Sequence, residues 1–191
     1  MLIIDNFIKD IEALSIDFSS IFKDTYDYGG DSVEDEISTV NSWDWVTKPK
    51  NKQEELIKFL IDNLHLDVDI KTIEYWTHIH TRGTNLEWHT NKDEVVRYKS
   101  GEFRHPLCSI VYYPIEKDVE GGFLEISGVK EKDIYNDGSF LRFEREYERI
   151  KPKYNRVVVF DPSYLHRVTN IIKGIRYSIA IDVWDRKLEK L

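Results

Sequence analysis

Short segments rich in β-branched and aromatic residues follow one another after residue 70, and this pattern constrains the fold most strongly. Turn-forming sequences such as Gly121-Gly122 and Asp161-Pro162-Ser163 separate these segments. Strands at such regular spacing predict a jelly roll, also called a double-stranded β-helix. The predicted strands are 71–79, 86–90, 107–114, 122–127, 139–144, 156–160, 165–170 and 175–184.

Helical patterns precede these strands. Residues 6–18 carry an apolar stripe of helical spacing behind a candidate N-cap at Asn6, made of Phe7, Ile8, Ile11, Leu14 and Phe18. Residues 51–64 predict an amphipathic helix whose inward positions are Leu56, Phe59, Leu60 and Leu64. Residues 27–50 look irregular. Because no Pro- or Gly-rich linker divides the chain, we expect one domain over 1–191, with a helical N-terminal support (1–69) and a jelly-roll core (70–185).

The composition disfavours several classes of partner. The chain has 27 Lys and Arg against 35 Asp and Glu, a net charge of −8, so binding to nucleic acid or to an anionic membrane is not expected. Neither a basic leader nor a run of about 18 apolar residues is present, which predicts no membrane span. The single cysteine, Cys108, cannot form an internal disulfide, and this favours a cytoplasmic location.

Two histidines stand where strands of a small barrel would bring them together. His89 and Asn91 are two residues apart on a predicted strand, so their side chains share a face. His166 begins another predicted strand, and strand ends converge at the mouth of a barrel, where ligands bind. Two imidazoles and a third donor can hold a divalent metal. Taken separately, either histidine could instead be a hydrogen-bonded structural residue.

An arginine lies within an otherwise apolar predicted strand. Arg176 needs a partner there, because an isolated buried charge is costly. Its planar guanidinium suits a carboxylate, and Ser178 on the same face could add a hydroxyl donor. A structural Arg–Asp ion pair is the alternative.

The chain resembles the Fe(II)/2-oxoglutarate-dependent oxygenases, especially the prolyl-hydroxylase-like group. The resemblance covers about residues 70–185 and is weaker at residues 3–7. Its elements occur in the order that the family has: Leu86-Glu87-Trp88-His89, Lys92-Asp93-Glu94, Ile110-Val111-Tyr112-Tyr113, Gly121-Gly122-Phe123-Leu124, residues 155–161, His166 and Arg176-Tyr177-Ser178.

The resemblance implies that His89 and His166 bind Fe(II), and that Arg176 binds the far carboxylate of 2-oxoglutarate with help from Ser178 and Tyr113. Tyr112 would point to the opposite face of its strand and pack in the core. The implied activity is hydroxylation of a peptidyl residue, an amino acid or another small molecule. It would consume O2 and 2-oxoglutarate and release succinate and CO2, with ascorbate as a further candidate cofactor.

One position departs from the family pattern. The first metal motif of the family is His-any-Asp/Glu, and here it reads His89-Thr90-Asn91. An amide oxygen can ligate a metal, although it brings no negative charge, so Asn91 is the third expected ligand. Asp93 is a substitute that would require the strand to bend. The second hypothesis is therefore a catalytically degenerate jelly-roll binding module that retains 2-oxoglutarate or metal binding.

Two further features are open to more than one interpretation. The charged stretch 91–106 is either a solvated loop or a lid beside the metal candidates. His78 and His80 share a strand face, which could be exposed, could contribute to the substrate pocket, or could form a different metal site with His89.

Overall fold

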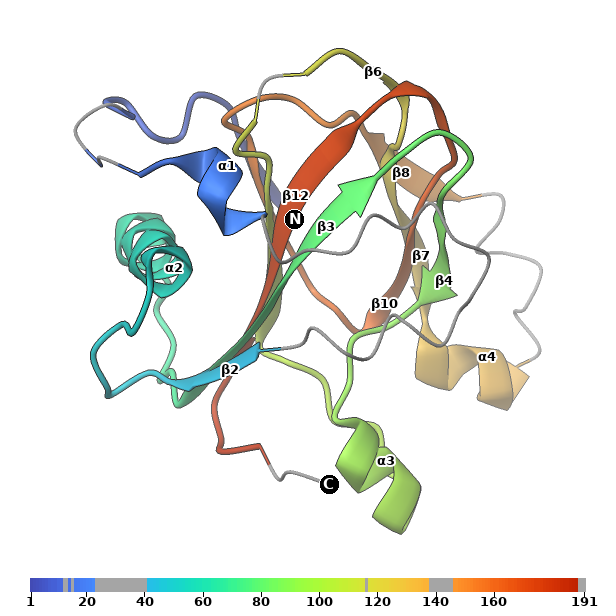
Figure 1. Ribbon diagram of the computed structural model, residues 1–191. Coiled ribbons are helices and arrows are strands. Elements are labelled where there is room, and N and C mark those ends of the chain that lie inside the picture. The colour runs from blue at the N-terminus through green and yellow to red at the C-terminus, as the bar shows by residue number, and fades with distance from the viewer. Residues whose placement is uncertain (12–13, 15, 23–40, 116, 138–145, 189–191) are drawn as a thin grey trace.

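Two antiparallel sheets face each other in the computed structural model, which describes residues 1–11, 14, 16–22, 41–115, 117–137 and 146–188 (Figure 1). The larger sheet has six strands in the order β1-β9-β5-β12-β3-β2. Their bounds are β1 Leu2–Ile4, β9 Val157–Phe160, β5 Cys108–Tyr112, β12 Arg176–Trp184, β3 Thr72–His80 and β2 Asn41–Asp44.

The smaller sheet has four strands in the order β4-β10-β7-β8, and a separate pair joins β11 to β6. The antiparallel pairing and the opposed sheets confirm the predicted jelly-roll class. The bounds of these strands are β4 Leu86–His89, β10 Tyr164–Val168, β7 Leu124–Lys130, β8 Tyr147–Ile150, β11 Ile171–Gly174 and β6 Val119–Gly121.

Helix α2 (Lys52–Leu64) covers the outer face of the larger sheet (Figure 1). Asn51 caps it by accepting a hydrogen bond from the Glu54 backbone N–H, and the helix ends at His65 in the left-handed conformation. This confirms the helix predicted over 51–64. The face that packs on the sheet is rotated from the predicted one, since Phe59 and Leu64 are only partly buried while the fully packed apolar residues are Leu56, Ile57, Leu60 and Ile61.

The helix predicted over residues 6–18 is wrong. Asn6 has a φ of 51°, far from the extended conformation of an N-cap. Phe7 and Ile8 direct their backbone groups to Asn155, whose side-chain amide accepts from Ile8 N and donates to Ile8 O. These long-range hydrogen bonds replace helical ones, and the helix in the described part of this segment is α1 (Phe18–Ile21). Residues 12, 13 and 15 lie outside the described residues.

The N-terminal third is therefore not only a helical support. Strand β1 pairs with β9 and strand β2 pairs with β3, so both extend the larger sheet. The apolar residues of the segment 6–18, which was wrongly predicted to be helical, still contribute to the core. Ile8 is buried in the main hydrophobic cluster, and Phe7, Ile11 and Leu14 pack against that cluster. Burial was predictable there, whereas the backbone path was not.

Several connections also differ from the expectation. The stretch 91–106 contains helix α3 (Glu94–Ser100), and helix α4 (Glu131–Asp137) follows β7. Strands β6, β8 and β11 were not predicted, and the predicted strand 139–144 lies outside the described residues. Within the described residues, no helix is long and apolar enough to cross a membrane.

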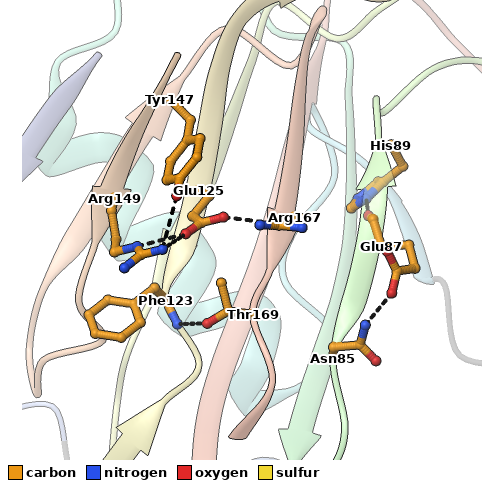
Figure 2. A network of polar contacts seen from close by, with 9 residues as sticks. All are labelled: Asn85, Glu87, His89, Phe123, Glu125, Tyr147, Arg149, Arg167 and Thr169. Atoms are coloured by element: carbon orange, nitrogen blue, oxygen red, sulfur yellow. Dashed lines mark hydrogen bonds and ion pairs between the residues drawn. The ribbon is translucent and has the colours of Figure 1, made fainter. Parts of the chain in front are cut away.

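A buried carboxylate ties together the strands of the smaller sheet (Figure 2). Glu125 on β7 accepts hydrogen bonds from Arg149 on β8 and from Arg167 on β10, each at 2.7 Å from the guanidinium Nε. Arg167 also lies over the ring of Trp88, at 4.6 Å from the centroid. These contacts hold β10 in place, and β10 carries His166.

An ion pair fastens the N-terminus to the barrel, and its effect on stability should depend on pH. Asp5 accepts from Arg156 (Nε to Oδ1, 2.6 Å) and from Lys153 (Nζ to Oδ2, 2.8 Å). These two cations hold the pKa of Asp5 well below its ordinary value of 3.8. A depressed folded-state pKa contributes stability above the unfolded-state pKa, and this contribution is lost as the pH falls.

We therefore expect Asp5→Asn to lower the free energy of unfolding by about 1 kcal/mol at pH 7, a modest loss because solvent screens this partly exposed pair. The difference from wild type should shrink as the pH falls from about 5 toward 2. Urea titrations at several pH values measure it, with the exposed Asp67→Asn as a control. A difference that did not vary with pH would contradict the electrostatic origin.

Candidate functional site

One cavity between the two sheets contains most of the residues singled out in the sequence. Strands β4 and β10 contribute to one wall, and β3, β5 and β12 contribute to the other. The polar residues that line it are His78, His89, Asn91, Ser109, His166, Arg176, Ser178 and Asp182. The fold thus brings the metal candidates and the arginine to the same enclosed space.

His89 and His166 face each other across the β4–β10 pair. They are register partners in the antiparallel ladder, and their ring centroids are 4.3 Å apart. Each Nδ1 lies against a backbone carbonyl, that of Glu87 at 2.7 Å (Figure 2) and that of Tyr164 at 2.9 Å. Because a carbonyl only accepts, Nδ1 carries the proton and Nε2 of each neutral ring keeps its lone pair.

The surroundings of these two rings favour their neutral form. Burial lowers the pKa of His89, and burial together with the neighbouring His89 lowers the pKa of His166 well below its usual value. A neutral imidazole with a fixed tautomer is the form that binds metal ions. The pair is therefore prepared for a cation.

Arg176 is buried at the start of β12, and its contacts are neutral. Its Nη1 donates to Ser178 Oγ at 2.8 Å and to His80 Nδ1 at 3.2 Å, and its Nη2 donates to the Tyr113 hydroxyl at 3.4 Å. Burial and the nearby guanidinium lower the pKa of His80 well below its usual value, which keeps that ring an acceptor. These partners orient the guanidinium without neutralising it.

The charge of Arg176 lacks a protein counter-ion in the described part of the chain. No carboxylate of the described residues lies within 4.0 Å of it, and its Nε is buried with no hydrogen-bond partner among them. The structural Arg–Asp pair considered above is therefore not found there. A buried cation held only by neutral groups is a site for an anion.

The strand alternation separates the two tyrosines as predicted. Tyr112 packs in the cluster between the larger sheet and α2, whereas Tyr113 packs on the inner side and reaches Arg176. Gly122 makes room for the arginine, since a Cβ there would collide with Ile171 and lie 3.1 Å from Arg176 Cδ. The Gly121-Gly122 turn is thus part of the wall beside the guanidinium.

Asn91 is held by two buried residues that the sequence analysis did not select. Its Nδ2 donates to Ser109 Oγ at 3.1 Å and to Asp182 Oδ1 at 3.0 Å, and Ser109 Oγ donates to the same carboxylate oxygen. Burial raises the pKa of Asp182 to about 7, although both hydrogen bonds act in the opposite direction. The signal was available, because Asp182 lies an even number of residues from Arg176 and Ser178 along one strand and shares their face.

Asp93 has a different role from the one considered for it. Its carboxylate accepts from the Val96 backbone N–H and caps helix α3. It is also absent from the residues that line the cavity around His89 and His166. The substitute-ligand interpretation therefore has no geometric support.

His78 and His80 stack on β3, with ring centroids 5.1 Å apart. They pair in register with Ser178 and Arg176, so they belong to the wall beside the guanidinium. No group of three His, Cys, Asp or Glu residues that could hold a metal occurs within the described ranges. A separate metal site of His78, His80 and His89 is thus not supported.

The remaining donors still fit a divalent iron. Two imidazole Nε2 atoms and an amide oxygen are ligands that first-row divalent metals accept. No third carboxylate or imidazole joins the histidine pair in the described structure, and Asn91 lines the same cavity as the pair.

Comparisons with known proteins identify a matching family and similar folds. Residues 75–184 match the family model described as the 2OG-Fe(II) oxygenase superfamily. A prolyl-4-hydroxylase from Pseudomonas putida shares the fold with a TM-score of 0.50 and 15% identity, covering 79% of this chain and 74% of that one. A prolyl hydroxylase from Trichoplax adhaerens, in complex with a hypoxia inducible factor peptide fragment, has a TM-score of 0.51 and 14% identity, covering 96% and 83%. No curated protein matches the sequence.

Proposed function

This chain belongs to the 2OG-Fe(II) oxygenase superfamily, and we propose that it is an active hydroxylase that uses His89, Asn91 and His166 to bind Fe(II). The family implies Fe(II) and 2-oxoglutarate as cofactor and cosubstrate, with O2 as the oxidant. When bound, iron supplies the oxygen activation that couples 2-oxoglutarate decarboxylation to hydroxylation of a C–H bond, with release of succinate and CO2.

The observation that carries this proposal is the shared cavity of Arg176 and the histidine pair. The guanidinium binds the far carboxylate of 2-oxoglutarate, and Ser178 and Tyr113 hold the guanidinium in position. His89 and His166, whose Nε2 lone pairs are free of the backbone, would hold the metal that binds the other end of the same ligand. The apolar walls around them exclude water from the reacting groups.

A peptidyl residue is the substrate class that we favour. The fold is shared with two prolyl hydroxylases, one of which is in complex with a peptide fragment. Their low identity supports the fold alone, so the substrate stays a proposal, as do a role for ascorbate and the cytoplasmic location.

The alternative is a binding module that retains 2-oxoglutarate or metal without turnover. Asn91 favours it, because the neutral amide removes a negative charge from the metal position. The intact arrangement of both histidines, Arg176, Ser178 and Tyr113 favours the enzyme.

Succinate formation from 2-oxoglutarate and added Fe(II) tests the choice, since uncoupled turnover needs no prime substrate. We expect turnover by wild type, at least equal turnover by Asn91→Asp, and unchanged turnover by Asp93→Ala. The last variant should lose about 1 kcal/mol of stability, because only a helix cap is removed.

Absence of succinate with wild type and with Asn91→Asp would favour the binding module. Loss of turnover in a folded Asp93→Ala variant would show that Asp93 ligates the metal and that Asn91 does not.

A further inference from the structure

Asp182 is a buried carboxylate that has no role in the metal and 2-oxoglutarate binding proposed above. It is 2% exposed, lies on the inner face of β12, and lines the same cavity as the two histidines. Its hydrogen-bond donors are the Asn91 amide and the Ser109 hydroxyl. Burying a carboxylate costs free energy unless neighbouring groups pair with it or form hydrogen bonds with it.

The hydrogen bonds fix the orientation of Asn91. A carboxylate oxygen only accepts, so the amide nitrogen of Asn91 must face Asp182, and a flipped amide would set two oxygens against each other. Ser109 donates its one proton to Asp182, and its oxygen lies beside that carboxylate oxygen as a second acceptor for the Asn91 amide nitrogen. The nitrogen side of the amide thus faces Ser109 and Asp182, and its oxygen is the atom left for a cation.

The position of Asp182 also indicates that it acts through Asn91. The described residues contain no cluster of three His, Cys, Asp or Glu side chains of metal-binding geometry, so Asp182 does not join the histidine pair directly. Asn91 stands next to it, at 3.0 Å from the carboxylate. A carboxylate that accepts from an amide N–H polarises that amide and makes its oxygen a better ligand.

We propose that Asp182, assisted by Ser109, is a positioning residue that aims the Asn91 amide oxygen at the metal. It also places a carboxyl group, one residue removed from the ion, beside the position where the His89-Thr90-Asn91 motif lacks one. The carboxyl group beside this centre thus comes from β12 of the larger sheet, whereas the family motif has it two residues after the first histidine. This inference rests on the proposed function, because it assumes a metal at His89 and His166.

Metal affinity, rather than activity, provides the test. Mn(II), which is stable in air, is titrated into the full chain by calorimetry. We expect Asp182→Asn to weaken Mn(II) binding about 10- to 100-fold, the usual cost of losing an outer partner of a ligand. Ser109→Ala should weaken it less. The matched control is Glu54→Gln, which changes a similarly buried carboxylate on α2 that does not line the cavity.

The reciprocal double variant separates a specific role from general damage. Asn91→Asp with Asp182→Asn exchanges amide and carboxylate, keeping the hydrogen-bonded pair and the total charge. We expect it to bind Mn(II) at least as tightly as wild type, and the visible spectrum of bound Co(II) to change because its ligand changes. A protein misfolded by Asp182→Asn would not be rescued in this way.

Three results would overturn the inference. Mn(II) affinity could be unchanged in Asp182→Asn, or the double variant could remain as weak as the single one. Alternatively, Asn91→Ala could retain the metal while Asp182→Asn loses it, which would make Asp182 itself the ligand. If wild type bound no Mn(II) at all, the proposed function would fail as well, so the two failures are distinguishable.

Discussion

Arg176→Met is expected to abolish 2-oxoglutarate binding while stabilising the ligand-free protein. The affinity should fall about 100- to 1000-fold, because charge-assisted hydrogen bonds are each worth about 1.5–3 kcal/mol. Methionine retains the apolar stem and removes a buried charge that has only neutral partners in the described structure, so the melting temperature without ligand should rise. Calorimetric titration with 2-oxoglutarate and thermal unfolding measure the two effects.

Arg176→Lys is the matched variant, since it keeps the charge and loses the planar fork, and it should bind 2-oxoglutarate with intermediate affinity. Arg104→Met, which removes an exposed arginine that does not line the cavity, controls for loss of any arginine. If Arg176→Met were less stable than wild type and bound 2-oxoglutarate normally, the arginine would be a structural residue.

His166→Ala is expected to remove metal binding. The Nε2 lone pairs of the two imidazoles are fixed in direction, because the Nδ1 of His166 donates to the Tyr164 carbonyl and the Nδ1 of His89 donates to the Glu87 carbonyl. Losing one of them should weaken Mn(II) binding by at least about 100-fold and stop succinate formation. His65→Asn, at the exposed C-terminus of α2, is the control and should leave both quantities unchanged.

Circular dichroism establishes whether the His166→Ala variant remains folded, since the ring also contacts Phe160 at a centroid distance of 4.9 Å. A folded His166→Ala protein with wild-type Mn(II) affinity would place the metal elsewhere.

The sequence predicted the barrel core well, because alternation of apolar and polar residues reports directly on which face of a strand is buried. Tyr112 and Tyr113 were assigned to opposite faces correctly on that basis. The pairing of His89 with His166 follows from the ladder of β4 and β10, and no spacing in the sequence encodes that register. The resemblance implied only that the two histidines share a metal site.

Two of the three failures have the same physical cause, which is hydrogen bonding to residues distant in the sequence. Residues 6–18 carry apolar side chains at helical spacing. The backbone groups of Phe7 and Ile8 nevertheless form hydrogen bonds with Asn155, which is distant in the sequence. Asp93 was considered as a substitute metal ligand close to His89. Its carboxylate instead caps helix α3, which the highly charged sequence did not predict. Asp182 was visible as a polar residue in an apolar strand, but its partner Asn91 is 91 residues away.

Binding of 2-oxoglutarate with and without Mn(II) tests most directly whether a single ligand connects Arg176 to a metal at the histidine pair. We expect Mn(II) to tighten 2-oxoglutarate binding at least about tenfold, and 2-oxoglutarate to tighten Mn(II) binding by the same factor, because such coupling is reciprocal. Wild-type protein that bound 2-oxoglutarate with the same affinity in the presence and absence of Mn(II) would contradict the shared site.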